Sequence, residues 1–147
     1  SELRQGVYPS PMKDPYADER TQPFWDAALA NHLRVPKCDA CGTFVLPPAP
    51  FCFVCQSQDF TYTDLPGTGT IYTFTVVRHP LHPGLNDVVP YVSGVIDLDG
   101  TQGAGARMIV NITDCDVETV KIGDKVQIYF EPVSETFAVP RARPVAT

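Results

Sequence analysis

Apolar residues near the N-terminus recur at the spacing of an α-helix. Between residues 21 and 36 they fall close to one helical stripe, formed by Phe24, Trp25, Ala28, Leu29 and Leu33. Thr21 suits the N-cap, and Pro36 would end the helix. The stripe predicts either core packing against the next domain or a docking face, with Phe24 and Trp25 as contact candidates. Residues 1–20 are polar and Pro-rich, and we expect a flexible arm there.

From residue 59 onward the pattern changes to short runs rich in β-branched and aromatic residues. Five runs predict strands, at residues 59–65, 70–78, 91–98, 106–112 and 125–131, and residues 136–139 form a candidate sixth. Five short antiparallel strands with a helical turn before the last favour a small closed barrel, most simply an OB-fold. The sequence therefore predicts a mainly β protein with one N-terminal helix.

Two Cys-x2-Cys pairs stand between the helix and the barrel. Two residues between cysteines let both thiolates reach one ion, and two such knuckles supply the four sulfurs that Zn2+ prefers. The four predicted ligands are Cys38, Cys41, Cys52 and Cys55. Gly42 follows the first knuckle, where a positive φ helps the chain turn under the metal, and Gln56 holds the equivalent place in the second. A closed four-sulfur site leaves no position for substrate, so we expect a structural metal.

Other interpretations of the four cysteines remain open from spacing alone. They could form disulfides or a redox-active pair, and four thiolates could hold iron as well as zinc. A module this small cannot bury enough apolar surface by itself, so a metal would take the place of a core. The expected organisation is thus an arm at 1–20, a helix at 21–36, a metal ribbon at 37–58 and an OB-fold at 59–147.

Composition and charge narrow the function classes. The 147 residues include 11 basic and 17 acidic side chains, a net charge of −6, which lacks the electrostatic footprint of a nucleic-acid-binding protein. We find neither a signal peptide nor an apolar run of the roughly 20 residues that a membrane span needs. We therefore expect no membrane or nucleic-acid partner and a cytoplasmic location, where paired cysteines favour metal over disulfide.

The loop of residues 78–87 is the second candidate contact region. It contains Arg78, His79 and His82, and loops on a rigid scaffold often carry function. The chain shows no nucleophile elbow, phosphate-binding glycine loop or His-Glu-x-x-His motif. We therefore predict no catalytic residue in the chain itself.

The order of these features resembles the "domain of unknown function 35" family. The resemblance rests on the Phe24-Trp25 helix, the two knuckles with Pro47-Pro48 between them, the run at 67–77, Pro90-Tyr91 and the run at 122–126. It implies a rubredoxin-like zinc ribbon joined to an OB-fold barrel of five to six strands, with a structural Zn2+.

The resemblance also implies a function. Members of the family look like accessory subunits that occur beside, or fused to, thiolase-fold enzymes and MaoC-type enoyl-CoA hydratases, where they bind acyl-CoA or complete the partner's active complex. One branch works with a thiolase-like aldolase in bacterial sterol side-chain degradation. The Pro-rich arm and the first residue, Ser1, fit a domain excised from a longer hydratase subunit.

Two rival functions follow from the same elements. OB-folds and zinc ribbons also bind single-stranded nucleic acid, for which Tyr72, Phe74 and Tyr91 could supply stacking rings. A rubredoxin-like iron site would instead make the chain an electron carrier. The leading hypothesis remains a non-catalytic module that docks a thiolase-like aldolase or thiolase and supports acyl-CoA retro-aldol or Claisen chemistry, with a steroid acyl group as one candidate.

Overall fold

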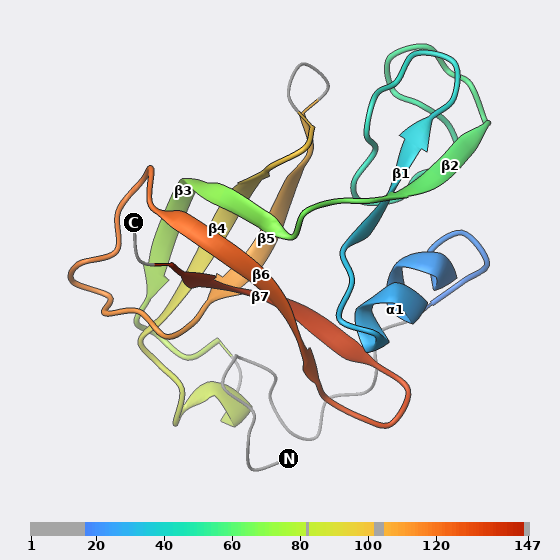
Figure 1. Cartoon of the computed structure of the whole chain (residues 1–147). Coiled ribbons are helices and arrows are strands. Elements are labelled where there is room, and N and C mark those ends of the chain that lie inside the picture. The colour runs from blue at the N-terminus through green and yellow to red at the C-terminus, as the bar shows by residue number, and fades with distance from the viewer. Residues whose placement is uncertain (1–16, 82, 102–104, 146–147) are drawn as a thin grey trace.

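The computed structural model describes residues 17–81, 83–101 and 105–145. One α-helix, a short 3-10 helix and seven strands follow one another in the chain (Figure 1): α1 Gln22–Leu29, β1 Arg34–Cys38, β2 Phe60–Asp64, β3 Thr68–Val77, η1 Pro83–Leu85, β4 Tyr91–Leu98, β5 Arg107–Ile112, β6 Lys125–Pro132 and β7 Ala138–Pro144. Among these described residues, no helix has the length and apolar character that crossing a membrane requires. The mainly β class predicted from the sequence is confirmed.

The barrel is closed in the strand order β3-β4-β5-β7-β6, with β6 pairing back to β3. All neighbours are antiparallel except β5 and β7, which run parallel at Asn111↔Arg141 and Ile112↔Ala142. Five strands closed in this Greek-key order form an OB-fold. Its last strand is β7, of which the sequence predicted only residues 136–139 as a candidate, because prolines and arginines obscure its alternation.

The strand expected at 59–65 is present as β2, but it does not join the barrel. It pairs with β1 from Arg34↔Asp64 to Cys38↔Phe60, forming a separate two-stranded sheet that belongs to the ribbon. Pro36, expected to end the helix, lies inside β1 opposite Tyr62. A proline has no N–H to donate, and a two-stranded sheet offers the edge position that tolerates it.

The helix is shorter than predicted, because it ends at Leu29 rather than near Pro36. Asn31 has a φ of 62°, which turns the chain out of the helix, and Asn is one of the few residues that adopt this conformation readily. The Asn31 side-chain oxygen accepts a 3.1 Å hydrogen bond from the backbone N–H of Phe130 on β6. The turn that ends the helix is local, because the N–H of Asn31 donates to the Ala28 carbonyl and the N–H of His32 to the Ala27 carbonyl, both at 2.9 Å. An Asn just after an apolar stripe is the sequence signal for such an end.

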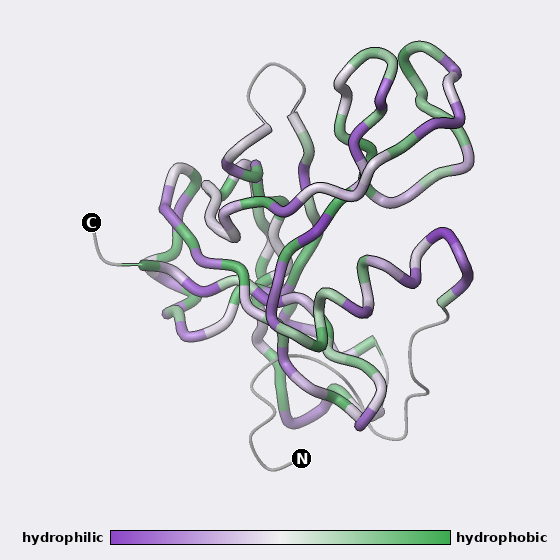
Figure 2. Tube along the Cα trace, turned by 45° about the vertical axis from the view of Figure 1, so that its right-hand side comes forward, coloured by the Kyte–Doolittle hydropathy of each residue, from purple (hydrophilic) through white to green (hydrophobic). Residues whose placement is uncertain are grey.

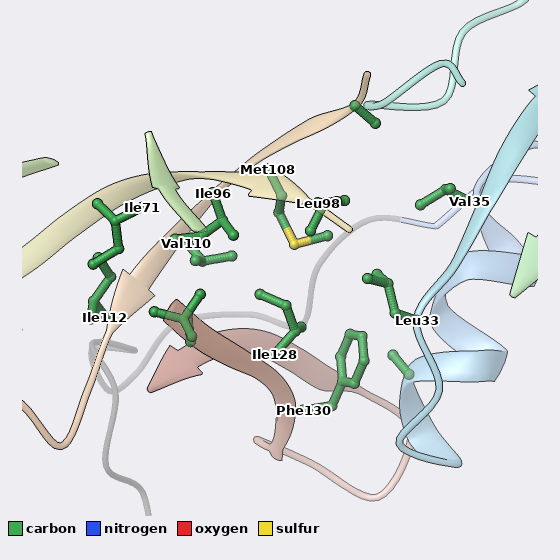
Figure 3. Packing of buried hydrophobic residues seen from close by; sticks show 14 of the residues in the cluster. Leu33, Val35, Ile71, Ile96, Leu98, Met108, Val110, Ile112, Ile128 and Phe130 are labelled. Atoms are coloured by element: carbon green, nitrogen blue, oxygen red, sulfur yellow. The ribbon is translucent and has the colours of Figure 1, made fainter. Parts of the chain in front are cut away.

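One hydrophobic core joins the barrel to the helix and to the base of the ribbon. Barrel residues such as Ile71, Ile96 and Val126 are 1% exposed or less. Leu33 before β1 and Phe44 in the ribbon belong to the same cluster. Figure 3 shows Leu33 beside Phe130 at one end of this core, and Ile71 and Ile112 at the other. Because burying each large apolar side chain contributes about 1.5–3 kcal/mol, the shared core fixes the ribbon base against the barrel.

Gly69 on β3 gives a direct test of how tightly the barrel closes. A Cβ added there would lie 2.6 Å from the Asp97 backbone oxygen and 2.6 Å from Ile96 Cγ2. We predict that Gly69→Ala lowers the free energy of unfolding by about 1–3 kcal/mol, because a backbone oxygen cannot move aside.

The matched control for this substitution is Gly105→Ala. Its added Cβ would meet nothing nearer than 3.8 Å, so we expect a change within about 0.5 kcal/mol. Urea unfolding of the zinc-loaded variants, followed by circular dichroism, compares the two. Equal stability of both variants would contradict the packing described for β3 and β4.

Candidate metal centre and adjoining groove

The two cysteine knuckles share one backbone geometry. In the first, the N–H of Gly42 donates to the carbonyl of Cys38 at 2.9 Å, and in the second, the N–H of Gln56 donates to the carbonyl of Cys52 at 2.9 Å. Gly42 has a φ of 78° and Gln56 a φ of 62°. The turn expected after the first knuckle is thus present in both. Gln56 adopts it with a Cβ, at a cost of roughly 1–2 kcal/mol that the glycine avoids.

The four knuckle sulfurs lie within 4.8 Å of one another. Cys38 Sγ is 3.5 Å from Cys55 Sγ, and Cys41 Sγ is 3.6 Å from Cys52 Sγ. Four sulfurs about 2.3 Å from one zinc ion stand about 3.8 Å apart at the corners of a tetrahedron, so these distances fit. All five cysteines of the chain are free thiols, and a disulfide would need a separation of about 2.05 Å.

Hydrogen bonds within the cluster shift the pKa values of two of its cysteines in opposite directions. A hydrogen bond with Thr43 lowers the pKa of Cys41 to about 6. At Cys55 the backbone hydrogen bond from Ser57 lowers the pKa, but hydrogen bonds to the neighbouring sulfurs, Cys38 first, raise it to about 12. Four thiolates this close repel one another, and a divalent cation stabilises all four together.

The ribbon is therefore a structural zinc site. Cys38 and Cys52 are buried beside Val45 in a small core of their own, and the N–H of Val54 lies 3.4 Å from Cys52 Sγ. Four protein sulfurs close the coordination sphere, which leaves no open position for a substrate. Zinc has no redox chemistry, so the electron-carrier alternative would require iron in this site instead.

A groove of about 570 Å³ lies beside the ribbon and is lined mostly by apolar side chains. One wall is formed by α1 through Phe24 and Trp25, and a second by residues 46–48 of the ribbon. The floor is the outer face of β4 and β5, where Ile109 is 77% exposed. This face, which carries the second and third barrel strands, is the one on which OB-folds bind their ligands. Figure 2 shows hydrophobic stretches on both ribbon loops.

The two aromatic candidates on α1 occupy different positions in this wall. Phe24 is 8% exposed and packs edge-on against Phe130, with ring centroids 6.2 Å apart. Trp25 is less buried and packs edge-on against Phe137 at 5.5 Å. The structure thus brings both residues to the groove, with Phe24 anchoring the helix to the barrel and Trp25 nearer the surface. Their role as contacts stays a prediction.

The contact candidates in the loop of residues 78–87 are not part of the groove. Arg78 forms an exposed ion pair with Glu118 at 3.1 Å, and His79 is exposed. Neither residue lines the groove, and His82 lies outside the described residues. The groove residues of β5 were missed in the sequence. Ile109 was the available signal, since it is apolar at an outward position between the inward Met108 and Val110.

The rings proposed for nucleic-acid stacking do not share a surface. Tyr72 is 50% exposed, whereas Phe74 packs against the hydrophobic core. Tyr91 lines a separate hollow of about 170 Å³ near Cys115. Because stacking on successive bases needs rings along one groove, this arrangement gives the nucleic-acid alternative no support.

A zinc ribbon leading into an OB-fold defines the class of this chain. Residues 25–61 match a family described as "ChsH2, rubredoxin-like zinc ribbon domain", and residues 62–131 match one described as "ChsH2, C-terminal OB-fold domain". The chain is 31% identical to a "DUF35 domain-containing scaffold protein" of Methanothermobacter thermautotrophicus over 105 residues, which are 71% of this chain and 75% of that protein. The chain belongs to the DUF35 family.

The chain is also similar to a chain of one solved structure and to part of one longer protein. A solved structure titled "Ltp2-ChsH2(DUF35) aldolase" matches with a TM-score of 0.76 and 28% identity, over 90% of this chain and 100% of that one. A "Probable enoyl-CoA hydratase alpha subunit" of Thermomonospora curvata is 30% identical over 137 residues, which are 92% of this chain. The chain spans only 41% of the length of that hydratase subunit.

The ligand set is tested by replacing one buried sulfur. We predict that Cys38→Ser loses the metal and unfolds the ribbon, because three thiolates and a hydroxyl bind zinc far more weakly. Metal analysis of the purified protein should fall from one zinc per chain towards none. Cys115→Ser is the matched control, since Cys115 lies outside the cluster. Full zinc occupancy in Cys38→Ser would contradict the assigned ligands.

Proposed function

We propose that this chain is a non-catalytic accessory module that docks a thiolase-like aldolase or thiolase. In that complex it helps to hold an acyl-CoA thioester, with a steroid acyl group as one candidate, for retro-aldol or Claisen chemistry carried by the partner. The observation that carries the proposal is the likeness, over nearly the whole chain, to the chain of a structure titled as an aldolase. The relatives named scaffold proteins support the same accessory role.

The site supports a role in holding rather than in transforming a ligand. The metal centre is coordinatively closed, and the groove walls are formed by carbon-rich side chains such as Trp25, Pro47 and Ile109. A volume of about 570 Å³ falls within the roughly 300–1,000 Å³ of small-molecule sites. The groove suits the apolar part of an acyl thioester, while the reacting groups would come from the partner.

A MaoC-type hydratase, fused or bound, is the second proposed partner. The chain matches less than half of two hydratase alpha subunits, covering 41% of one and 39% of the other. One of these relatives, from Mycobacterium tuberculosis, is named a 3-oxo-4,17-pregnadiene-20-carboxyl-CoA hydratase alpha subunit. These names favour a CoA thioester as the ligand.

Zinc-binding free cysteines favour a reducing compartment such as the cytoplasm.

Co-expression with a thiolase-like aldolase from the same organism tests the proposal. We expect the two proteins to elute together in size-exclusion chromatography. The partner alone should lose most of its aldolase activity, because its substrate is then held less well. Separate elution together with full activity of the partner alone would contradict the accessory role.

A further inference from the structure

Arg107 stands where the apolar groove meets a polar pocket. It lines the groove together with Ile109. It also lines a second hollow of about 460 Å³, which lies between the first residues of β5 and β6 and the last residues of β4. The polar pocket carries Lys125, Asp97 and Asp99 among its charged side chains. The two hollows therefore share one cationic residue, and a ligand extending from one to the other would pass over it.

A β-bulge places an aromatic ring beneath this arginine. The β3–β4 register breaks between Ile71 and Thr73, so Tyr72 and Thr73 are both exposed where strict alternation would turn one of them inward. Bulges often re-aim a side chain in this way. The Arg107 guanidinium carbon lies 3.8 Å from the centroid of the Tyr72 ring. The stack holds the face of the guanidinium and leaves its N–H groups, which lie in its plane, open to an anion.

The charges around Arg107 leave it available to a ligand. None of the four ion pairs among the described residues includes Arg107. Asp97 is its cross-strand partner on β4, whereas Asp99 accepts a 2.7 Å hydrogen bond from Thr68. Lys125 donates to Thr70 at 2.9 Å. The pocket thus carries both signs, and its cation on the groove side is Arg107.

We propose that Arg107, stacked on Tyr72, binds the phosphate end of a CoA thioester whose pantetheine arm and acyl chain extend along the groove past Ile109. The inference rests on the proposed acyl-CoA function and assigns the residue that selects the nucleotide-bearing form of the ligand. A planar, always-charged guanidinium matches two phosphate oxygens at once. Asp97 opposes the same phosphates and limits the affinity.

Trp25 provides the readout, because it is the only tryptophan of the chain and lines the groove. Its fluorescence is titrated with octanoyl-CoA and with octanoyl-pantetheine, which lacks the nucleotide and its phosphates. We expect Arg107→Gln to weaken octanoyl-CoA binding about tenfold, as loss of a charge-assisted contact does. It should leave octanoyl-pantetheine binding unchanged, since that probe offers no phosphate.

Three further variants make the test specific. Asp97→Asn should strengthen octanoyl-CoA binding several-fold by removing a like charge. Ile109→Ser should weaken both probes, and Arg78→Gln, whose exposed ion pair with Glu118 lies off the groove, should change neither. Each variant is first checked for zinc content and thermal unfolding, so that a folding defect is recognised. Arg107→Lys keeps the positive charge but lacks the planar guanidinium. Its affinity for octanoyl-CoA should lie between those of the wild type and Arg107→Gln.

Several outcomes would overturn the inference. Unchanged octanoyl-CoA binding in Arg107→Gln, or equal weakening of both probes, would show that Arg107 does not read the phosphates. Equally tight competition by a single-stranded oligonucleotide would assign the stack to nucleic acid instead. If neither probe binds, alone or in the partner complex, while the two proteins still elute together, this inference fails and the accessory role stands. Selective CoA binding without co-elution would support Arg107 as the phosphate contact and contradict the accessory role.

Discussion

The convergence of four cysteine sulfurs on one metal ion is the constraint from which the rest of this structure follows. The ribbon's own core is only Cys38, Val45 and Cys52, with two partly buried neighbours. Zinc binding to peptides of this size supplies about 10–16 kcal/mol at neutral pH, far more than so few apolar side chains can. The ion therefore takes the place of a core. It also holds the segment between the knuckles in one conformation.

That segment links the metal to the groove. Phe44 from the ribbon reaches the main hydrophobic core, and residues 46–48 form one wall of the groove. The β1–β2 sheet continues the connection, because Tyr62 on β2 donates a hydrogen bond to the Arg20 carbonyl just before α1. Leu65 donates to the Leu33 carbonyl at 2.9 Å. A structural ion outside the groove can thus set the distance between two of the groove walls.

Local patterns in the sequence revealed the metal ligands and most of the barrel, and the failures have one physical origin. Cys-x2-Cys spacing and strand alternation are short-range properties, so both can be recognised in the sequence without knowing the fold. The place of β2 outside the barrel depends on its pairing with β1, more than 20 residues earlier in the chain. The groove is assembled from five separate segments of the chain, so no sequence motif marks it. The outward-facing Ile109 was the available signal for the groove. An isolated apolar residue on a strand is too common to identify a site.

Hydrogen exchange measured by mass spectrometry, with and without zinc, tests the dependence of the groove on the metal most directly. Zinc removal by a chelator should speed amide exchange in β1 and β2. It should also speed exchange at residues 44–48 and in α1, while the barrel strands β3 to β5 stay protected by their own core. If α1 and residues 44–48 keep their protection after zinc is lost, the groove does not depend on the metal.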